Sequence, residues 1–307
     1  MINSPTRLRP ALERLDCTPL PRLLCGRKGV EGAAWSSTRA DAPVETDTAE
    51  QRIESAMRYV ARWRTGRGPR AVELSPDEDL FAGPRSLAAK QAAVRLIQSI
   101  LATGTAVALT TRGGFDDARG LAEVARRFPG QLTIRIGLFS LDPDTNARWE
   151  SGLSGPKTRL GLAQALADHA NVSVEVGPLI PFVNAERGQL EAVLRAVAKV
   201  GIETVSLRWV AGGDPLYRQV AREVSRSAGR MLRGWLHQPG SLYPGGRRGL
   251  APQVRGARQG DATVLAGPLG IRFQECPCLD HGAERPCVMV KTQPPRVFDQ
   301  LSLALTS

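Results

Sequence analysis

The sequence has little of what secreted, membrane-spanning and histidine-dependent proteins need. It contains no run of about 18 apolar residues. Its first residues, MINSPTRLRPALERLD, include no apolar segment of the kind found in secretory signals. With only three histidines, general acid–base catalysis by histidine has little support. The five cysteines are an odd number, which argues against a framework of disulfide bonds. We therefore expect a cytoplasmic protein that does not act at a membrane.

Several motifs of common enzyme classes are also missing. No strand-like segment is followed by GxGxxG or GxxxxGK[ST], and the nearest glycine-rich turn, TTRGGF at 110–115, is too short and has no lysine. The sequence has no GxSxG, no HExxH and no kinase signature. The absence of the two glycine-rich motifs weighs against a nucleotide-binding doubly wound sheet.

What the sequence does have is a regular alternation of strand-like and helical segments. The strands are short and rich in Val, Ile and Leu, as in a parallel sheet covered by helices. We expect an α/β fold: a partial (β/α) barrel of about five to six parallel strands at 49–245, with an irregular N-terminal segment at 1–48 and a basic, cysteine-bearing C-terminal extension at 246–307. The expected strands are 70–74, 105–111, 131–139, 171–177 and 203–209, and the expected helices are 49–63, 86–104, 116–128, 155–170, 185–201 and one long helix at 214–236.

In such a barrel the functional groups lie on the loops that follow the strands. One of these loops carries Asp77, Glu78 and Asp79, which could bind a metal or a ribose; the alternative is a solvated loop. Asp116 and Asp117 follow the next strand, where carboxylates at the start of a helix would stabilise its N-terminus. A barrel enzyme of another kind, using the three acidic residues at 77–79, is one function that the sequence leaves open.

Two further loops carry a resemblance to a known family. The runs LFSLDPDTNARWESGLSGPKTRLGLAQAL and VSVEVGPLIPFVN resemble the radical S-adenosylmethionine enzymes of the spore-photoproduct-lyase-like group, over roughly 50–245. The matching residues are Ser140, Asp142, Glu150, Pro156, Arg159, Leu160, Pro178, Ile180, Pro181 and Asn184. The resemblance implies the partial-barrel fold and a cofactor site at Ser140, Glu150, Pro178 and Asn184.

The family's cluster motif is absent. These enzymes use CxxxCxxC to hold three irons of a [4Fe–4S] cluster, whose fourth iron binds S-adenosylmethionine, and no such triplet occurs in this sequence. We therefore expect a degenerate, cluster-less relative that is a binding or accessory factor in DNA repair or another DNA transaction. The alternative is an active radical enzyme of the lyase-like type, whose cluster is held by a non-standard set of cysteines.

The cysteines offer a second metal hypothesis. ECPCLDHGAERPC places Cys276, Cys278, His281 and Cys287 close together, and these ligand types suit Zn²⁺. Cys25, with Cys17, could join them in a cluster built from both ends of the chain. The alternative is that they are free cysteines in a partly ordered tail.

A net charge of +11 and a pI of about 10.2 favour nucleic acid as a partner. The alternative is a basic composition without such a role. The arginines gather in two glycine- and proline-rich segments that we expect to be loops suited to phosphate contacts. The candidates for DNA contact are Arg62, Arg64, Arg67, Arg247, Arg248 and Arg255.

The tail QLSLAL resembles the peptide by which bacterial proteins bind the sliding clamp. Gln300 would form hydrogen bonds at the rim of the clamp's pocket, and Leu301, Leu303 and Leu305 complete the motif, the last two filling apolar subsites. The alternative is a terminal strand or helix that packs on the barrel.

Overall fold

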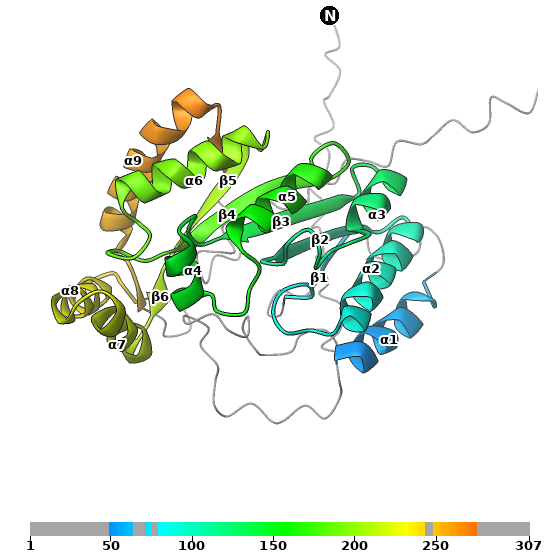
Figure 1. Cartoon of the computed structure of the whole chain (residues 1–307), viewed down its shortest axis with the longest axis horizontal. Coiled ribbons are helices and arrows are strands. Elements are labelled where there is room, and N and C mark those ends of the chain that lie inside the picture. Colours follow the sequence, from blue (N-terminus) through cyan, green and yellow to red (C-terminus); the bar gives the residue numbers. More distant parts are fainter. Residues whose placement is uncertain (1–48, 64–70, 75–78, 243–247, 275–307) are drawn as a thin grey trace, which may run out of the picture.

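The computed structural model describes residues 49–63, 71–74, 79–242 and 248–274. Six strands form one parallel sheet in the order β1-β2-β3-β4-β5-β8. In the described part of the chain β1 and β8 are the two edges, so the sheet is open and the expected partial (β/α) barrel is confirmed (Figure 1). The strands of this sheet are β1 (Ala71–Leu74), β2 (Ala106–Thr111), β3 (Leu132–Leu138), β4 (Asn171–Leu179), β5 (Thr204–Trp209) and β8 (Arg272–Phe273).

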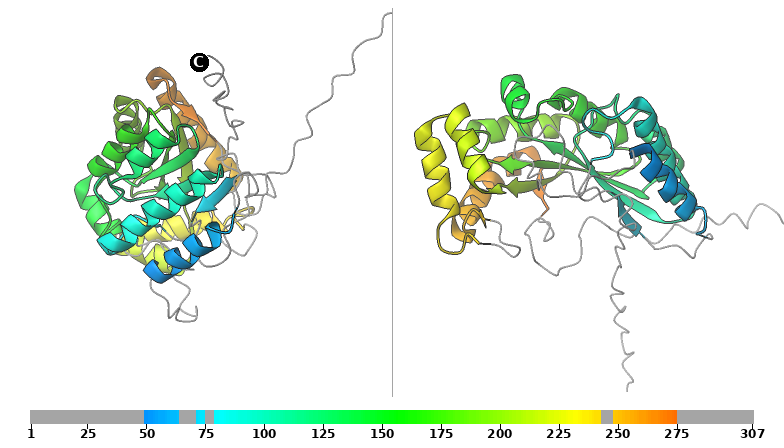
Figure 2. Two further views of the ribbon diagram at one scale, coloured as in Figure 1. Left: turned by 90° about the vertical axis from the view of Figure 1, so that its right-hand side faces the viewer. Right: turned by 90° about the horizontal axis from the view of Figure 1, so that it is seen from below.

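Helices cover one face of this sheet, and further elements lie at its ends (Figure 2). A two-stranded antiparallel ribbon is formed by β6 (Ala211–Gly212) and β7 (Arg248–Gly249). The helices are α1 (Ala49–Val60), α2 (Leu87–Ala102), α3 (Leu121–Arg127), α4 (Pro143–Trp149), α5 (Pro156–Leu166), α6 (Arg187–Lys199), α7 (Asp214–Glu223), α8 (Arg226–Leu236) and α9 (Pro252–Ala266), followed by a 3₁₀ turn at Gly267–Leu269. No helix in the described residues is long and apolar enough to cross a membrane.

The main apolar core lies between the sheet and the helices. Alternate residues of the central strands, such as Leu109, Ile134 and Val174, point into it, where they meet buried residues such as Leu96 of α2 and Leu194 of α6. Because neighbouring residues of a strand point to opposite faces, the other half of each strand forms the inner face of the partial barrel. That face carries polar and charged residues, namely Thr110, Arg135, Ser173, Glu175, Ser206 and Arg208.

The prediction of one long helix at 214–236 was wrong. The chain breaks at Val224 and Ser225, and it returns as α8 antiparallel to α7. Ser225 caps the new helix, because its hydroxyl accepts a hydrogen bond from the amide of Ala228 at 3.1 Å. By contrast, Ser86 caps α2 as the sequence indicates, through the amide of Ala89 at 3.0 Å.

Two helices were not expected. The short helix α4 lies in the loop after β3 and begins at Pro143. It is capped by Asp142, whose carboxylate accepts a hydrogen bond from the Thr145 amide at 3.0 Å. We expected a loop at 245–258 because this segment is rich in glycine and proline. Its residues from 252 onward instead belong to α9, and Pro252 at the first turn is compatible with a helix start. The strand β8 then pairs with β5, so residues beyond 245 contribute to the sheet.

Candidate functional site

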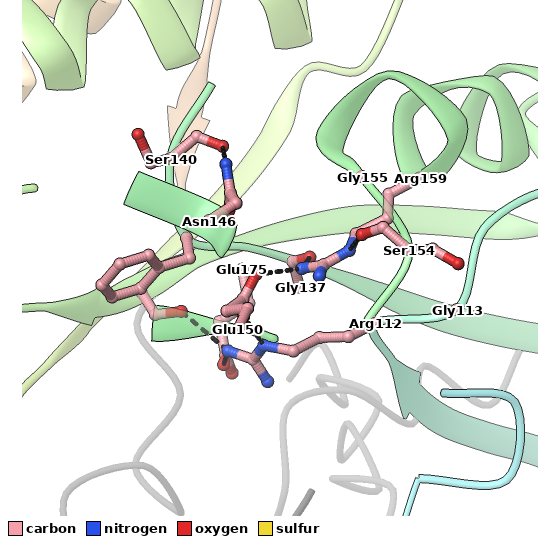
Figure 3. A network of polar contacts seen from close by, with 12 residues as sticks. Arg112, Gly113, Gly137, Ser140, Asn146, Glu150, Ser154, Gly155, Arg159 and Glu175 are labelled. Atoms are coloured by element: carbon pink, nitrogen blue, oxygen red, sulfur yellow. Dashed lines mark hydrogen bonds and ion pairs between the residues drawn. The ribbon is translucent and has the colours of Figure 1, made fainter. Parts of the chain in front are cut away.

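The carboxyl ends of parallel strands meet at one edge of the sheet, which we call the rim. Here the rim consists of the segments that follow β2, β3, β4 and β5, and it includes the GPLIPFVN segment of β4 and its loop. Charged residues of these segments and of the strands and helix beside them contact one another, and we define the rim cluster as Arg112, Arg135, Glu150, Arg159, Glu175 and Arg208, all buried except Arg208. Figure 3 shows four of them: Arg112, Glu150, Arg159 and Glu175.

Glu150 is the first centre of the rim cluster. Its side chain is fully buried, and Arg112 Nε donates a hydrogen bond to its Oε1 at 2.8 Å. Its Oε2 lies 2.7 Å from Arg159 Nη1, a contact that is an ion pair rather than a well-aligned hydrogen bond. Arg159 also donates to the carbonyl groups of Ser154 and Gly137, at 2.6 and 3.0 Å. Glu150 therefore joins the loop after β2 to α5 in the interior of the molecule.

Glu175, in the middle of β4, is the second centre. It contacts three arginines: Arg208 at 3.2 Å, Arg135 at 3.7 Å and Arg112 at 3.8 Å. Burial alone would raise the pKa of the Glu175 carboxyl, but the charges of Arg208, Arg112 and Arg135 together hold that pKa below its usual value. Glu175 is therefore a carboxylate at neutral pH.

The side chain of Arg112 reaches Glu150 and Glu175 because Gly137 leaves room for it. A Cβ atom at Gly137 would lie 2.9 Å from Arg112 Cγ, which is too close. Arg112 also donates a hydrogen bond to the carbonyl of Gly177 at 2.7 Å. The path of this side chain across β3 thus depends on a glycine on the inner face of that strand.

Burial shifts the pKa of a second member of the cluster. Loss of solvent lowers the pKa of the Arg159 guanidinium, and the neighbouring Arg112 lowers it further, while Glu150 opposes the shift. An arginine remains cationic at neutral pH in proteins. The rim cluster therefore combines four cationic groups with two anionic ones.

Asp79 differs from the solvated loop residue that we considered. It is buried, and its Oδ1 accepts hydrogen bonds from the amides of Phe81 and Ala82, both at 3.0 Å, and from the Thr111 hydroxyl at 2.7 Å. Its Oδ2 accepts from the Arg112 amide. The solvated reading was wrong for Asp79, because this carboxylate ties the loop after β1 to the end of β2. Asp77 and Glu78 lie outside the described residues.

Asp117 does not have the helix-capping role that we expected. The helix α3 begins later, at Leu121, so Asp117 does not cap it. Instead its carboxylate pairs with Lys90 of α2 at 2.6 Å and accepts hydrogen bonds from Ser154 and from the Gly114 amide at 2.7 Å. Burial raises its pKa, but these donors outweigh burial and hold the pKa below the usual value.

The residues that the resemblance offers as cofactor ligands have protein partners at the rim. The Asn184 side chain accepts from the Ile180 amide at 2.7 Å and donates to the carbonyls of Phe139 and Pro178, at 2.8 and 3.0 Å. The Ser140 hydroxyl accepts from the Asp142 amide at 3.0 Å. Asn184 thus joins the loops after β3 and β4. Cofactor binding by Ser140, Glu150, Pro178 and Asn184 stays a prediction.

The candidate DNA-contacting arginines do not form one group. Arg62 is exposed just after α1, which packs on α2 near the β1 edge. Arg248 lies in β7 and Arg255 on α9, near the opposite edge of the sheet, so the expected loop position was wrong for both. Arg64, Arg67 and Arg247 lie outside the described residues.

The metal and clamp candidates cannot be located in the fold. The described ranges contain no group of three or more His, Cys, Asp or Glu residues that could hold a metal ion. The residues that lie outside those ranges are Cys17, Cys25, Cys276, Cys278, His281, Cys287, Gln300, Leu301, Leu303 and Leu305. The zinc site and the clamp-binding tail stay predictions.

Most of the rim cluster was missed from the sequence, although a signal is present. Arg135, Glu175 and Arg208 stand at alternate positions among apolar residues of short strands: LTIRIGL, NVSVEVG and TVSLRW. A strand covered by helices on both faces is apolar throughout, so such charges indicate a polar inner face. Arg112 lies in the glycine-rich turn TTRGGF, and no role was predicted for its side chain.

Comparison with known proteins supports the fold. No family model matches the chain, and no curated protein is significantly similar to it. Among solved structures, spore photoproduct lyase complexed with dinucleoside spore photoproduct aligns with a TM-score of 0.50 at 13% identity, covering 74% of this chain and 66% of that one. A mutant of the lyase with the same ligand gives 0.50 at 14% identity, over 74% and 67%. The chain spans about two thirds of the length of these proteins and shares the partial-barrel fold of spore photoproduct lyase.

Proposed function

We propose that this protein is a binding or accessory factor in a DNA transaction, built on a radical S-adenosylmethionine-like partial barrel but without the standard three-cysteine cluster. The observation that carries the proposal is the rim cluster. Its carboxylates are held in ion pairs with arginines, which suits a rigid binding scaffold better than a site that exchanges protons. The described rim segments at 112–120, 139–142, 150–155 and 180–186 contain no histidine, cysteine or lysine that could act as a base or nucleophile.

Two further observations support nucleic acid as the ligand class. The chain is strongly basic, with a net charge of +11. Spore photoproduct lyase, which has the same type of fold, has been solved with a dinucleoside ligand. The clamp-like tail at 300–305 fits the same setting, because a DNA accessory factor would be recruited to replicating DNA by such a peptide.

A specific observation keeps a radical enzyme as the second candidate. Residues that carry the family resemblance contact one another or neighbouring loops at the rim. Glu150 pairs with Arg159, and Asn184 donates hydrogen bonds to the carbonyls of Phe139 and Pro178. An active enzyme would need cysteines such as Cys25 and Cys276 to hold a [4Fe–4S] cluster. The other possible use of the C-terminal cysteines is to bind Zn²⁺, with Cys276, Cys278, His281 and Cys287 as ligands.

Anaerobic purification followed by reconstitution with iron and sulfide separates the two candidates. The accessory role predicts no bound iron and duplex DNA binding that weakens as salt rises, because phosphate contacts release counterions. About four irons per chain, lost in Cys25→Ser or Cys276→Ser, would establish the radical enzyme instead. DNA binding that does not depend on salt, or no binding, would contradict the DNA role.

A further inference from the structure

The helical hairpin α7–α8 carries a concentration of exposed arginines that the sequence analysis did not single out. Arg218 and Arg222 lie one helical turn apart on α7. On α8, Arg226, Arg230 and Arg233 follow at spacings of four and three residues, so they lie on one side of the helix. All five are exposed, and we call them the hairpin arginines.

These arginines have few acidic neighbours. The hairpin contains only two carboxylates, Asp214 and Glu223. Arg222 pairs with the adjacent Glu223 at 2.8 Å. Within the described part of the chain, no ion pair is found for the other four. Their positive charge therefore faces solvent without compensation, unlike that of the rim cluster, where Glu150 and Glu175 offset the arginines.

The hairpin is held firmly by its apolar side. Leu232 and Leu236 of α8 and Val220 of α7 are completely buried in a second core cluster with Phe139 and Ile180. Because Phe139 and Ile180 belong to the loops after β3 and β4, this packing places the hairpin beside the rim. Figure 2 shows the hairpin (yellow) at one end of the molecule, opposite α1 (blue).

Aromatic contacts strengthen the same attachment. Phe182, in the loop after β4, stacks on Trp235 of α8, with ring centroids 5.1 Å apart. On the same ring system, the guanidinium of Arg258 from α9 lies 5.3 Å from the Trp235 centroid. These contacts fix α8 against both the loop after β4 and α9.

We propose that the hairpin arginines form the contact surface for a nucleic acid phosphate backbone and supply sequence-independent affinity; this rests on the DNA role proposed above. The spacing fits, because a helix rises about 1.5 Å per residue, which sets Arg226 and Arg233 roughly 10 Å apart along α8. Each strand of a duplex presents a phosphate about every 3.4 Å of its axis. The stripe of three arginines therefore spans about three such intervals, a run of about four phosphates.

The surface fits nucleic acid better than a lipid surface. A membrane-binding helix needs an apolar face that can enter the lipid. The apolar face of α8 is already buried in the protein, and the exposed apolar residues of the hairpin are Val224 and Met231. Trp235 is partly buried and already stacked on Phe182, so base stacking on it has no support and binding without base preference is expected.

The test compares two triple variants of the full chain that lose the same charge. One is Arg226→Gln, Arg230→Gln and Arg233→Gln on α8. The control is Arg95→Gln, Arg126→Gln and Arg127→Gln, which are exposed arginines of α2 and α3, the helices that lie toward the α1 end of the molecule (Figure 1). The probe is a short labelled DNA duplex of mixed sequence, titrated at several salt concentrations, with anionic phospholipid vesicles as a second probe.

We expect the α8 variant to bind the duplex at least about tenfold more weakly at low salt, with the slope of log affinity against log salt reduced by roughly 2 to 3, and the control to bind like the unchanged protein. Equal binding by the two variants would overturn the hairpin assignment while leaving DNA binding in place. Loss of vesicle binding alone in the α8 variant would assign the surface to lipid instead. If the unchanged protein does not bind the duplex, the proposed DNA role itself fails. Equal melting temperatures of the three proteins would show that the comparison concerns folded chains.

Discussion

The most direct consequence of the rim cluster concerns Glu150. Replacing it with Gln keeps the size of the side chain and removes its charge. Arg112 and Arg159, whose side chains are 4% and 1% exposed, would then lose the carboxylate that lies 2.8 and 2.7 Å from them. Removing one partner of a buried ion pair costs about 3–5 kcal/mol, because the remaining charge stays desolvated. At about 2–4 °C per kcal/mol for a domain of this size, the melting temperature should fall by roughly 6–20 °C.

A surface ion pair provides the control. Glu191 pairs with Arg195 on α6 at 2.6 Å, a similar distance, but the arginine is 66% exposed. Glu191→Gln should change the free energy of unfolding by less than about 1 kcal/mol. Thermal and urea unfolding of both variants, followed by circular dichroism, measures the difference.

A double-mutant cycle would show where the loss comes from. If uncompensated charge is the cause, Arg159→Met in the Glu150→Gln background should recover part of the lost stability, since the methionine buries without a charge. An unfolding free energy for Glu150→Gln within about 1 kcal/mol of the unchanged protein would refute the reasoning. Additive losses in the double variant would show that the two side chains act separately.

Two other predictions concern the hairpin and acid stability. Gly229→Ala should destabilise the protein by about 1–3 kcal/mol, since a Cβ there would lie 2.7 Å from both the Ala221 Cβ and the Tyr217 carbonyl oxygen. The control is Gly234→Ala in the same helix, where a Cβ would meet nothing within 4 Å, so this change should be neutral or stabilising. Urea unfolding that ranks the stabilities of the two variants in the opposite order would contradict the packing. Because its arginines hold the pKa of Glu175 below the unfolded value, the stability it contributes is complete above about pH 5 and is lost as pH falls through about 4.3 and below. The stability difference between the unchanged protein and Glu175→Gln should therefore shrink as pH falls from 6 to about 3, and a difference that stays constant over that range would disprove the ionic role.

The elements with a strong period were predictable from the sequence, and the interruptions were not. The helix α2 shows why prediction succeeds: its apolar residues recur on one face, Ser86 caps it, and both signals are local. The break between α7 and α8 was not predicted because the helical period of the sequence continues through Val224 and Ser225. Only the packing of the two helices against each other selects the turn. The helix α9 was not predicted because Gly256 favours a loop locally, while burial of Ala262 and Ala266 in the main core, where α9 packs on α6, outweighs that preference.

The candidate site was predicted in outline only. The loops after β3 and β4 were identified through Glu150, Arg159 and Asn184, but their role as ion-pair and hydrogen-bond centres depends on partners far apart in sequence. Arg112 and Glu150 are separated by 38 positions, and Arg112 contacts the Gly177 carbonyl across 65. No local pattern encodes such pairs. The hairpin arginines were missed for a different reason: each is ordinary for an exposed helix, and only the turn at Ser225 gathers them on one structural unit.

The buried charges also bear on why this sheet is a partial barrel and not a doubly wound layer. A second helix layer would cover the inner face and force Arg135 and Glu175 into an apolar contact, at a cost that such packing could not offset. The curved sheet instead lets Arg135 of β3, Arg208 of β5 and Arg112, which follows β2, converge on Glu175. Even with the Asp79 carboxylate included, arginines outnumber acidic groups there. An anionic ligand at the rim would therefore gain electrostatic stabilisation from groups already desolvated and fixed in place, which favours an anionic occupant.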